Sequence, residues 1–212
     1  MKKELANRIL SSIILIPITF FFIIKGSYFF NFFILICFCI IAYEWHMMSK
    51  KKNYSFYGFI FLIISAYTIY KLRSETDMGL FWFLLIMIVC VSTDIGGYFF
   101  GKLLKGPKLI KISPKKTYSG MIGGFLLSLI SVSVFMGYLV SEEFSLSLFA
   151  FVITISAISQ IGDIVISYFK RMAKIKDTGK IIPGHGGLLD RADGMIFAFP
   201  FSYFTISLNL VF

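Results

Sequence analysis

Cysteine and acidic side chains are scarce in this 212-residue sequence. The three cysteines, Cys37, Cys39 and Cys90, all lie inside apolar runs, and an odd number in such places excludes a disulfide framework. Asp and Glu number 11 against 21 Lys and Arg, which leaves a net charge of +10. In a soluble protein this excess would suggest nucleic acid. Here the first explanation for the excess of positive charge is a membrane protein, because the cytoplasmic loops of such proteins are rich in Lys and Arg.

Short alternating strands, internal repeats and linkers are absent too, so the sequence predicts helices rather than a membrane barrel. Hydrophobic residues make up 58% of the chain, against roughly 45–50% in globular proteins. Phe alone occurs 26 times, more apolar surface than a soluble fold of this size can bury. The composition therefore excludes a soluble domain, a disordered chain and a collagen-like chain. It predicts an all-α, polytopic integral membrane protein.

The apolar runs predict about seven transmembrane helices, since crossing about 30 Å of hydrocarbon takes around 20 residues. The first run follows Lys2, Lys3 and Arg8 as in a signal peptide, but it has no small-residue cleavage site, so we expect a retained anchor. The predicted spans are 9–24, 27–45, 54–70, 78–100, 118–140, 145–169 and 194–212.

The distribution of cations between these spans predicts the topology. Counting along the chain, 18 of the 21 Lys and Arg residues fall on the side of the N-terminus, and the other side has only Lys25, Lys71 and Arg73. The positive-inside rule therefore places the N-terminus in the cytoplasm. The two cytoplasmic loops, 101–117 and 170–193, are the segments with room for chemistry. We expect residues 1–89 to form N-terminal transmembrane helices and residues 90–212 to form a catalytic region.

Two carboxylates, Asp94 and Asp163, lie in or at the end of apolar runs. A charge inside the membrane costs roughly 2.5–3.5 kcal/mol, so each is a candidate functional group. At 1.5 Å per helical residue both lie about 10–12 Å below the next cytoplasmic lysine, which suits one cavity open to the cytoplasm. The alternative for each is a structural ion pair. Glu44, at the end of the second run, is interpreted as a solvated interfacial residue.

The segment 113–124 contains a possible phosphate site. Ser113 suits an N-cap and Pro114 the first helical position, so the sequence predicts that a helix starts here, with Lys115, Lys116 and Thr117 beside its N-terminus. Positive-inside lysines explain part of this pattern equally well. Its glycines, like Gly96, Gly97 and Gly101, also suit close helix packing.

The segment 167–194 is the most informative. Its first half is rich in cations, and a Pro-Gly-His-Gly-Gly turn follows, whose backbone N–H groups suit an anion. Asp190 and Asp193 then lie three residues apart, on one face if the segment is helical. Their hard oxygens suit Mg²⁺, which takes its remaining ligands from water and substrate phosphate. The alternative is a solvated loop whose charges pair with one another.

These residues resemble the signature of the phosphatidate cytidylyltransferase family, the CDP-diacylglycerol synthases. The resemblance covers about residues 90–212 and also includes the segments around Asp94, Ser113 and Asp163. Tyr118 and Ser119 depart from it, because Trp and Glu are usual there. The signature itself is met by Ser167, Lys170, Arg171, Lys176, Asp177, Pro183, His185, Gly186, Gly187, Asp190, Arg191 and Asp193.

The resemblance implies that CTP and phosphatidic acid give CDP-diacylglycerol and pyrophosphate in phospholipid biosynthesis. It implies Mg²⁺ as cofactor and leaves open a second cation such as K⁺. The expected partners are CTP, phosphatidic acid and the lipid bilayer, without nucleic acid; a homodimer is left open. The expected residues are Asp163, Asp190 and Asp193 for the metal; Lys170, Arg171, Lys176, His185 and Arg191 for catalysis; and Ser113, Lys115, Thr117, Gly186, Gly187 and Asp94 for substrate.

Two other classes of function stay open. A CTP-dependent lipid kinase or an isoprenoid-lipid cytidylyltransferase would use a similar site on another acceptor. A transporter or channel also uses buried Asp and glycine-rich segments, but its polar groups would lie near the midplane rather than on one face. The expected location is a bacterial cytoplasmic membrane, with the active site facing the cytoplasm.

Overall fold

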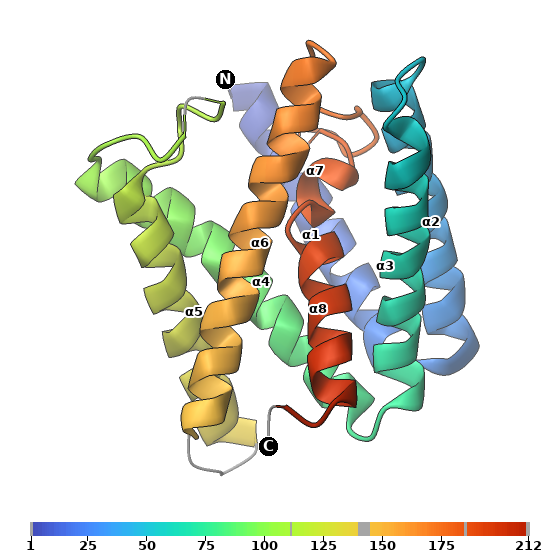
Figure 1. Cartoon of the computed structure of the whole chain (residues 1–212), viewed down its shortest axis with the longest axis vertical. Helices are drawn as coiled ribbons and strands as arrows, with labels where there is room; N and C mark the ends of the chain where they lie inside the picture. The colour runs from blue at the N-terminus through green and yellow to red at the C-terminus, as the bar shows by residue number, and fades with distance from the viewer. Residues whose placement is uncertain (1, 111, 140–144, 185, 211–212) are drawn as a thin grey trace. The chain divides into compact units, whose positions relative to one another are not determined.

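The structure is a computed structural model that describes residues 2–110, 112–139, 145–184 and 186–210. The described segments contain helices and no strand longer than an isolated bridge, so the predicted all-α class is confirmed. Figure 1 labels the elements along the chain. The helices are α1 (Lys2–Lys25), α2 (Ser27–Ser49), α3 (Ser55–Glu75), α4 (Gly79–Leu104), α5 (Tyr118–Leu139), α6 (Leu146–Met172), α7 (Leu189–Ala192) and α8 (Met195–Ser207).

Five of the described helices, α2 to α6, are long and apolar enough to cross a membrane. The polytopic membrane class is therefore confirmed. The apolar part of α1, Leu10–Lys25, and the helix α8 are apolar but shorter than the roughly 20 residues that a perpendicular crossing needs. The total of seven spans and the cytoplasmic N-terminus stay predictions.

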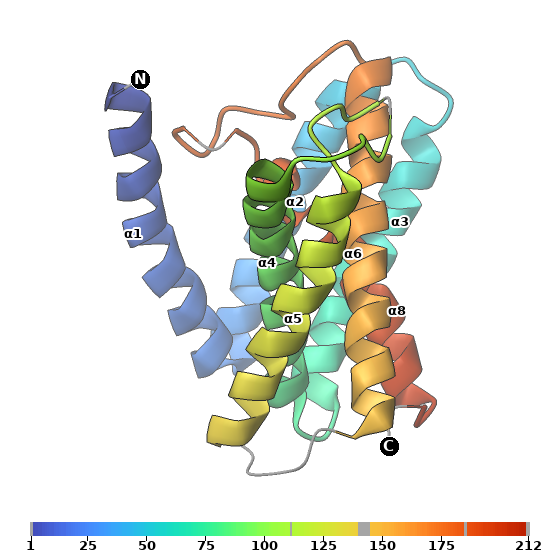
Figure 2. The ribbon, with the colours of Figure 1, turned by 90° about the vertical axis from the view of Figure 1, so that its left-hand side faces the viewer.

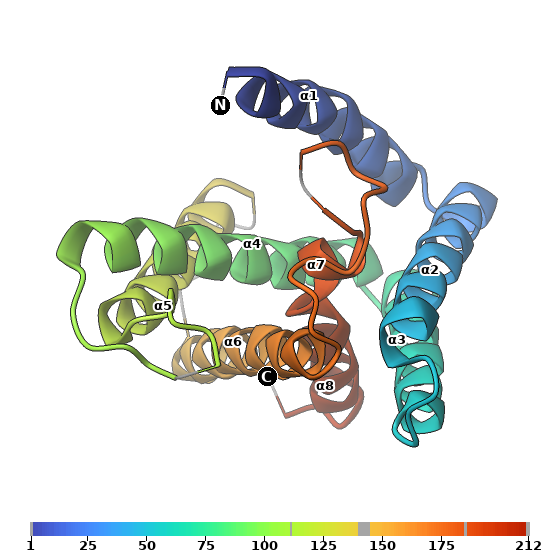
Figure 3. The same cartoon turned by 90° about the horizontal axis from the view of Figure 1, so that it is seen from above.

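The chain divides into two compact units, each described by itself. The first comprises residues 1–80 and 169–193, so the signature loop packs with the N-terminal helices. Within it α2 contacts α1, α3 and α7, and Figure 3 shows α2 beside α3. These units are defined by which residues pack together. The predicted division into N-terminal helices (1–89) and a catalytic region (90–212) is a division by function, and it stays a prediction.

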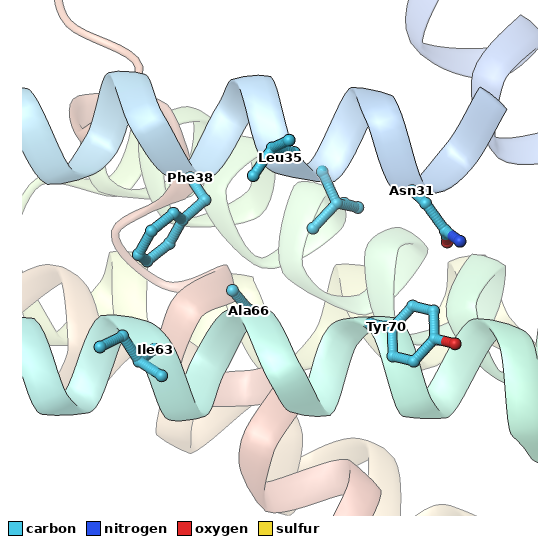
Figure 4. A pocket seen from close by; sticks show the side chains of 7 residues that line it. Asn31, Leu35, Phe38, Ile63, Ala66 and Tyr70 are labelled. Carbon is cyan, nitrogen blue, oxygen red and sulfur yellow. The ribbon is translucent and has the colours of Figure 1, made fainter. Parts of the chain in front are cut away.

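An arginine joins α3 to the end of α1 in the first unit. Arg73 donates from Nη2 to the carbonyl oxygen of Ile23 at 2.9 Å and from Nε to the same oxygen at 3.2 Å. Since the last carbonyls of a helix lack partners within it, this side chain caps α1 from another helix. A cavity of about 410 Å³ lies between α2 and α3 in the same unit, and Phe38 and Ile63 are among the residues that line it (Figure 4).

The second unit comprises residues 81–168 and 194–212, with α4, α5, α6 and α8. Figure 2 shows α4, α5 and α6 side by side. Between α4 and α5 the backbones approach so closely that a Cβ atom on Gly96 would lie under 3.0 Å from the carbonyl oxygen of Gly123. The oxygens of Thr93 and Ser156, on α4 and α6, lie 2.7 Å apart. The prediction that these glycines serve close helix packing is confirmed.

The predicted helix start at Ser113 is wrong, because α5 begins at Tyr118. Residues 113–116 instead form a turn in which the N–H of Lys116 donates to the carbonyl oxygen of Ser113 at 3.0 Å. Pro114 occupies the second turn position, where its fixed φ angle is equally favourable. Thr117 caps the helix, accepting the N–H of Gly120 on its hydroxyl oxygen at 3.1 Å.

Candidate functional site

The centre of the site in the first unit is the carboxylate of Asp190. Lys170, in the last turn of α6, donates to its Oδ1 at 2.9 Å. The backbone N–H groups of Thr178 and Gly187 donate to its Oδ2 at 2.8 and 3.0 Å. The side chains of Lys170 and Asp190 are 11% and 6% exposed. The signature residues Lys170 and Asp190, 20 positions apart, thus form a shielded ion pair, and the signature residue Gly187 donates to the same carboxylate.

These contacts decide the charge state of Asp190. Burial acts to raise the pKa of this carboxyl. The hydrogen bonds from Lys170, Gly187 and Thr178, with the attraction of the Lys170 charge, outweigh burial and leave the pKa below its usual value. Asp190 is therefore an anion throughout the neutral pH range.

A second buried carboxylate, Glu44 of α2, holds the same loop. Its Oε2 accepts the hydroxyl of Thr178 at 2.9 Å and the N–H of Leu189 at 2.8 Å, and its Oε1 accepts the N–H of Leu188 at 3.0 Å. Glu44 is only 1% exposed, so the interpretation of this residue as solvated is wrong. Hydrogen-bond donors of the loop replace the water molecules that solvate an exposed carboxylate, and this offsets the free-energy cost of burying Glu44.

The glycines of the signature make this arrangement sterically possible. Gly186 has a φ angle of +87°, in the region that only glycine adopts readily, and its carbonyl oxygen accepts the N–H of Ile182 at 3.0 Å to close a turn. A Cβ atom on Gly187 would lie 2.5 Å from Oε2 of Glu44. The predicted turn is therefore present. Phosphate binding by Gly186 and Gly187 stays a prediction.

In the second unit, Asp163 of α6 forms a separate ion pair. Its Oδ2 lies 2.5 Å from Nζ of Lys116, and its Oδ1 accepts the hydroxyl of Ser167 at 3.3 Å. The side chains of Asp163 and Lys116 are 31% and 22% exposed. A cation from the loop before α5 therefore lies beside this carboxylate. This is the structural ion pair that the sequence left open as the alternative for Asp163. The pairing brings Thr117, the residue after Lys116, to the same part of the unit.

The other predicted residues are mostly exposed. Arg171 donates to the carbonyl oxygen of Ile175 at 3.1 Å, within its own segment. Asp193 is 7% exposed and continues the helical conformation of α7, so it follows Asp190 by one helical turn as predicted. His185 lies outside the described residues. Lys115, Lys176, Arg191 and Asp94 are exposed, and Ser113 is half-buried.

The carboxylates are the groups that would hold a metal. Over the described ranges, no three His, Cys, Asp or Glu side chains form a group that could hold a metal ion. Asp190 accepts three hydrogen bonds, and a carboxylate has about four acceptor positions, so its hard oxygens fit one further bond to a cation. The assignment of Mg²⁺ to Asp163, Asp190 and Asp193 stays a prediction.

Sequence reasoning missed the contacts of two residues in these clusters. Glu44 carried a usable signal, because an acid at the end of a long apolar run is costly unless it has partners. The sequence places Lys116 in a candidate phosphate site, but nothing in it brings this residue to Asp163, 47 positions further on.

Fold and site together define a polytopic α-helical membrane protein with cation–carboxylate pairs in its polar segments. The family model described as the cytidylyltransferase family matches residues 53–209, and the chain belongs to this family.

The chain is similar to proteins named phosphatidate cytidylyltransferase. The one from Rickettsia bellii is 36% identical over 219 aligned positions, which cover 99% of this chain and 94% of the relative. Those from Staphylococcus saprophyticus and Bacillus subtilis are 39% and 40% identical. They match 73% and 65% of this chain, and the matches span only 62% and 52% of their own lengths.

Proposed function

We propose that this protein transfers the cytidylyl group of CTP to phosphatidic acid, giving CDP-diacylglycerol and pyrophosphate. The observation that carries the proposal is the similarity to the Rickettsia bellii phosphatidate cytidylyltransferase along nearly the whole of both chains. The charge pair of Lys170 and Asp190 supports it, because both belong to the signature and lie together in the fold.

The reaction needs no nucleophile from the protein. A phosphate oxygen of phosphatidic acid attacks the α-phosphorus of CTP, and the bond from that phosphorus to the oxygen bridging the α- and β-phosphates breaks, so pyrophosphate leaves. Positioning and charge neutralisation supply the catalysis in such a transfer. Arg171, Lys176 and Arg191 are exposed cations of the same segment and suit the phosphate groups of both substrates.

Asp190 and Asp193 would hold Mg²⁺, which when bound neutralises phosphate charge. Lys170 places its ammonium group beside this site, because its Nζ lies 2.9 Å from Oδ1 of Asp190. Its ammonium group keeps the carboxylate ionised and oriented.

The protein is an integral membrane protein, and we propose a cytoplasmic membrane with this site facing the cytoplasm. The cation excess on the side of loops 101–117 and 170–193 supports that orientation. A cytoplasmic site would meet CTP directly while phosphatidic acid stays in its leaflet.

The test is purified protein with CTP labelled at either the α- or the γ-phosphate and a panel of lipids. Label from the α-phosphate should enter the lipid product when phosphatidic acid is present, and label from the γ-phosphate should leave as pyrophosphate. Transfer of the γ-phosphate to lipid would indicate a lipid kinase and overturn the proposal. Transfer only to an isoprenoid phosphate would overturn the choice of acceptor.

A further inference from the structure

A mainly apolar groove lies in the first unit between α1 and α2, next to the signature loop. It has a volume of about 600 Å³, within the range of about 300–1,000 Å³ that is usual for small-molecule sites. Ile14 and Leu15 contribute from α1, Phe33 and Ile36 from α2, and Pro183 from the loop. Most of the lining side chains on both helices are apolar, and the hydroxyl groups of Ser11, Ser12 and Thr19 on α1 are the exceptions.

The loop lies at one end of this groove, as two separate contacts indicate. Ser11, near the start of the groove wall on α1, donates from its hydroxyl to the carbonyl oxygen of Pro183 at 3.1 Å. On α2 the loop is held by Glu44, four residues beyond Ile40 of the groove wall. Figure 3 shows the loop before α7 reaching α1. The far end of the groove, at Thr19 and Phe33, lies away from the loop.

The described charge of the groove lining lies at the loop. Among the described residues that line the groove, Arg191 is the one charged residue. It is exposed and adjoins Asp190, the centre of the candidate site. An apolar channel with a guanidinium group at one end matches a molecule that has a long hydrocarbon part and an anionic phosphate head.

The length of the groove fits one leaflet of a bilayer. Seven residues of α1 between Leu10 and Thr19 line it, and the nine helical steps between these two residues span about 13.5 Å at 1.5 Å per residue. Half of the hydrocarbon core is about 15 Å thick. The cavity between α2 and α3 offers a contrast, because its described lining includes Asn31 and Tyr70 but no charged side chain.

We propose that this groove binds the acyl region of the phospholipid acceptor, with its phosphate at Arg191 beside Asp190. The inference rests on the proposed function and adds the location of the lipid. It commits to a diacyl lipid with a terminal phosphate from the leaflet in which the loop lies.

The first experiment compares two neighbouring residues of α1. Ile14 lines the groove and is 50% exposed, whereas Ile13 is 63% exposed and does not line it. Ile14→Trp should raise KM for phosphatidic acid about tenfold or more, the lower end of what a misfit of one methylene costs in an apolar pocket. KM for CTP should stay unchanged. Ile13→Trp should change neither beyond about twofold, as for a surface substitution.

A second control lies in the other cavity. Ile36→Trp, in the groove, should act like Ile14→Trp, whereas Ile63→Trp, between α2 and α3, should act like Ile13→Trp. In the wild-type protein, phosphatidic acid with a photoactivatable acyl chain should label residues 10–19 and 33–40. Excess phosphatidic acid should prevent that labelling, and phosphatidylcholine with the same chains should not.

The outcomes separate the two proposals. Wild-type protein that transfers no α-phosphate to any lipid would overturn the proposed function. Active wild-type protein in which Ile14→Trp and Ile13→Trp have equal KM for phosphatidic acid would overturn the groove alone. A second copy of the chain in the groove would appear as a changed oligomeric mass in Ile14→Trp with an unchanged KM for lipid, and this too would overturn it.

Discussion

Removing the carboxylate of Glu44 should release the signature loop from α2. In Glu44→Ala the N–H groups of Leu188 and Leu189 and the hydroxyl of Thr178 lose their acceptor. Leu189 is 0% and Thr178 is 7% exposed, so water reaches these donors only if the loop moves.

The size of the effect follows from those three bonds. A hydrogen bond to a charged group contributes about 1.5–3 kcal/mol, and bonds that share one carboxylate are not additive. We therefore expect the loop to lose roughly 3–5 kcal/mol of local stability, with the lower value equal to more than a hundredfold in its opening equilibrium. Glu44→Gln should fall between wild type and Glu44→Ala, because its amide nitrogen replaces one acceptor with a donor.

Hydrogen exchange of the protein in lipid nanodiscs measures this directly. The amides of Leu188 and Leu189 should exchange about a hundredfold faster in Glu44→Ala, while those in α4 and α5 stay as in the wild type. Transfer from CTP should fall in parallel, mainly in kcat, if the loop must be ordered around Asp190 for the chemistry. Glu75→Ala is the matched control, since Glu75 is exposed and pairs with Lys71 of its own helix. Unchanged exchange at Leu188 and Leu189 would refute the reasoning.

Three further results are expected. Asp190→Asn should abolish transfer or raise the Mg²⁺ concentration that activity requires, with Asp177→Asn, an exposed neighbour, clearly milder; full activity at the same Mg²⁺ concentration would remove the metal assignment. Gly187→Ala should destabilise the loop by about 1–3 kcal/mol through overpacking against Glu44, seen as faster proteolysis of the loop at unchanged yield; wild-type proteolysis would contradict this. Reporter fusions after Lys111 and Phe212 should lie on opposite sides of the membrane, as seven spans require, and the same side for both would refute the odd number of spans.

The helices could be predicted from the sequence because a transmembrane helix is defined locally, by about 20 consecutive apolar residues. The helix that contains the predicted run 54–70 nevertheless extends to Glu75, since polar residues such as Lys71 continue a helix without interrupting its hydrogen bonds. The start of α5 was placed wrongly because Ser113 and Pro114 are as favourable in a turn as at a helix N-terminus.

The candidate site was predictable in its composition but not in its contacts. Lys170, Asp190 and Gly187 are signature residues, and the fold brings them together. The partner of the loop on α2 was not predictable, since Glu44 and Leu188 lie 144 positions apart and no local pattern links them. Such a pairing is decided by which helix faces the loop, a property of tertiary packing.

The bonds from Arg73 to the end of α1 bear on how the protein is synthesised. In a membrane, a carbonyl group at a helix end that has no donor costs several kcal/mol. The donor for Ile23 is encoded 50 residues later, at the end of α3. The last turn of the first helix therefore acquires this partner only after the ribosome has made the third helix. The three N-terminal helices are thus a unit of assembly, because the first is completed by the third.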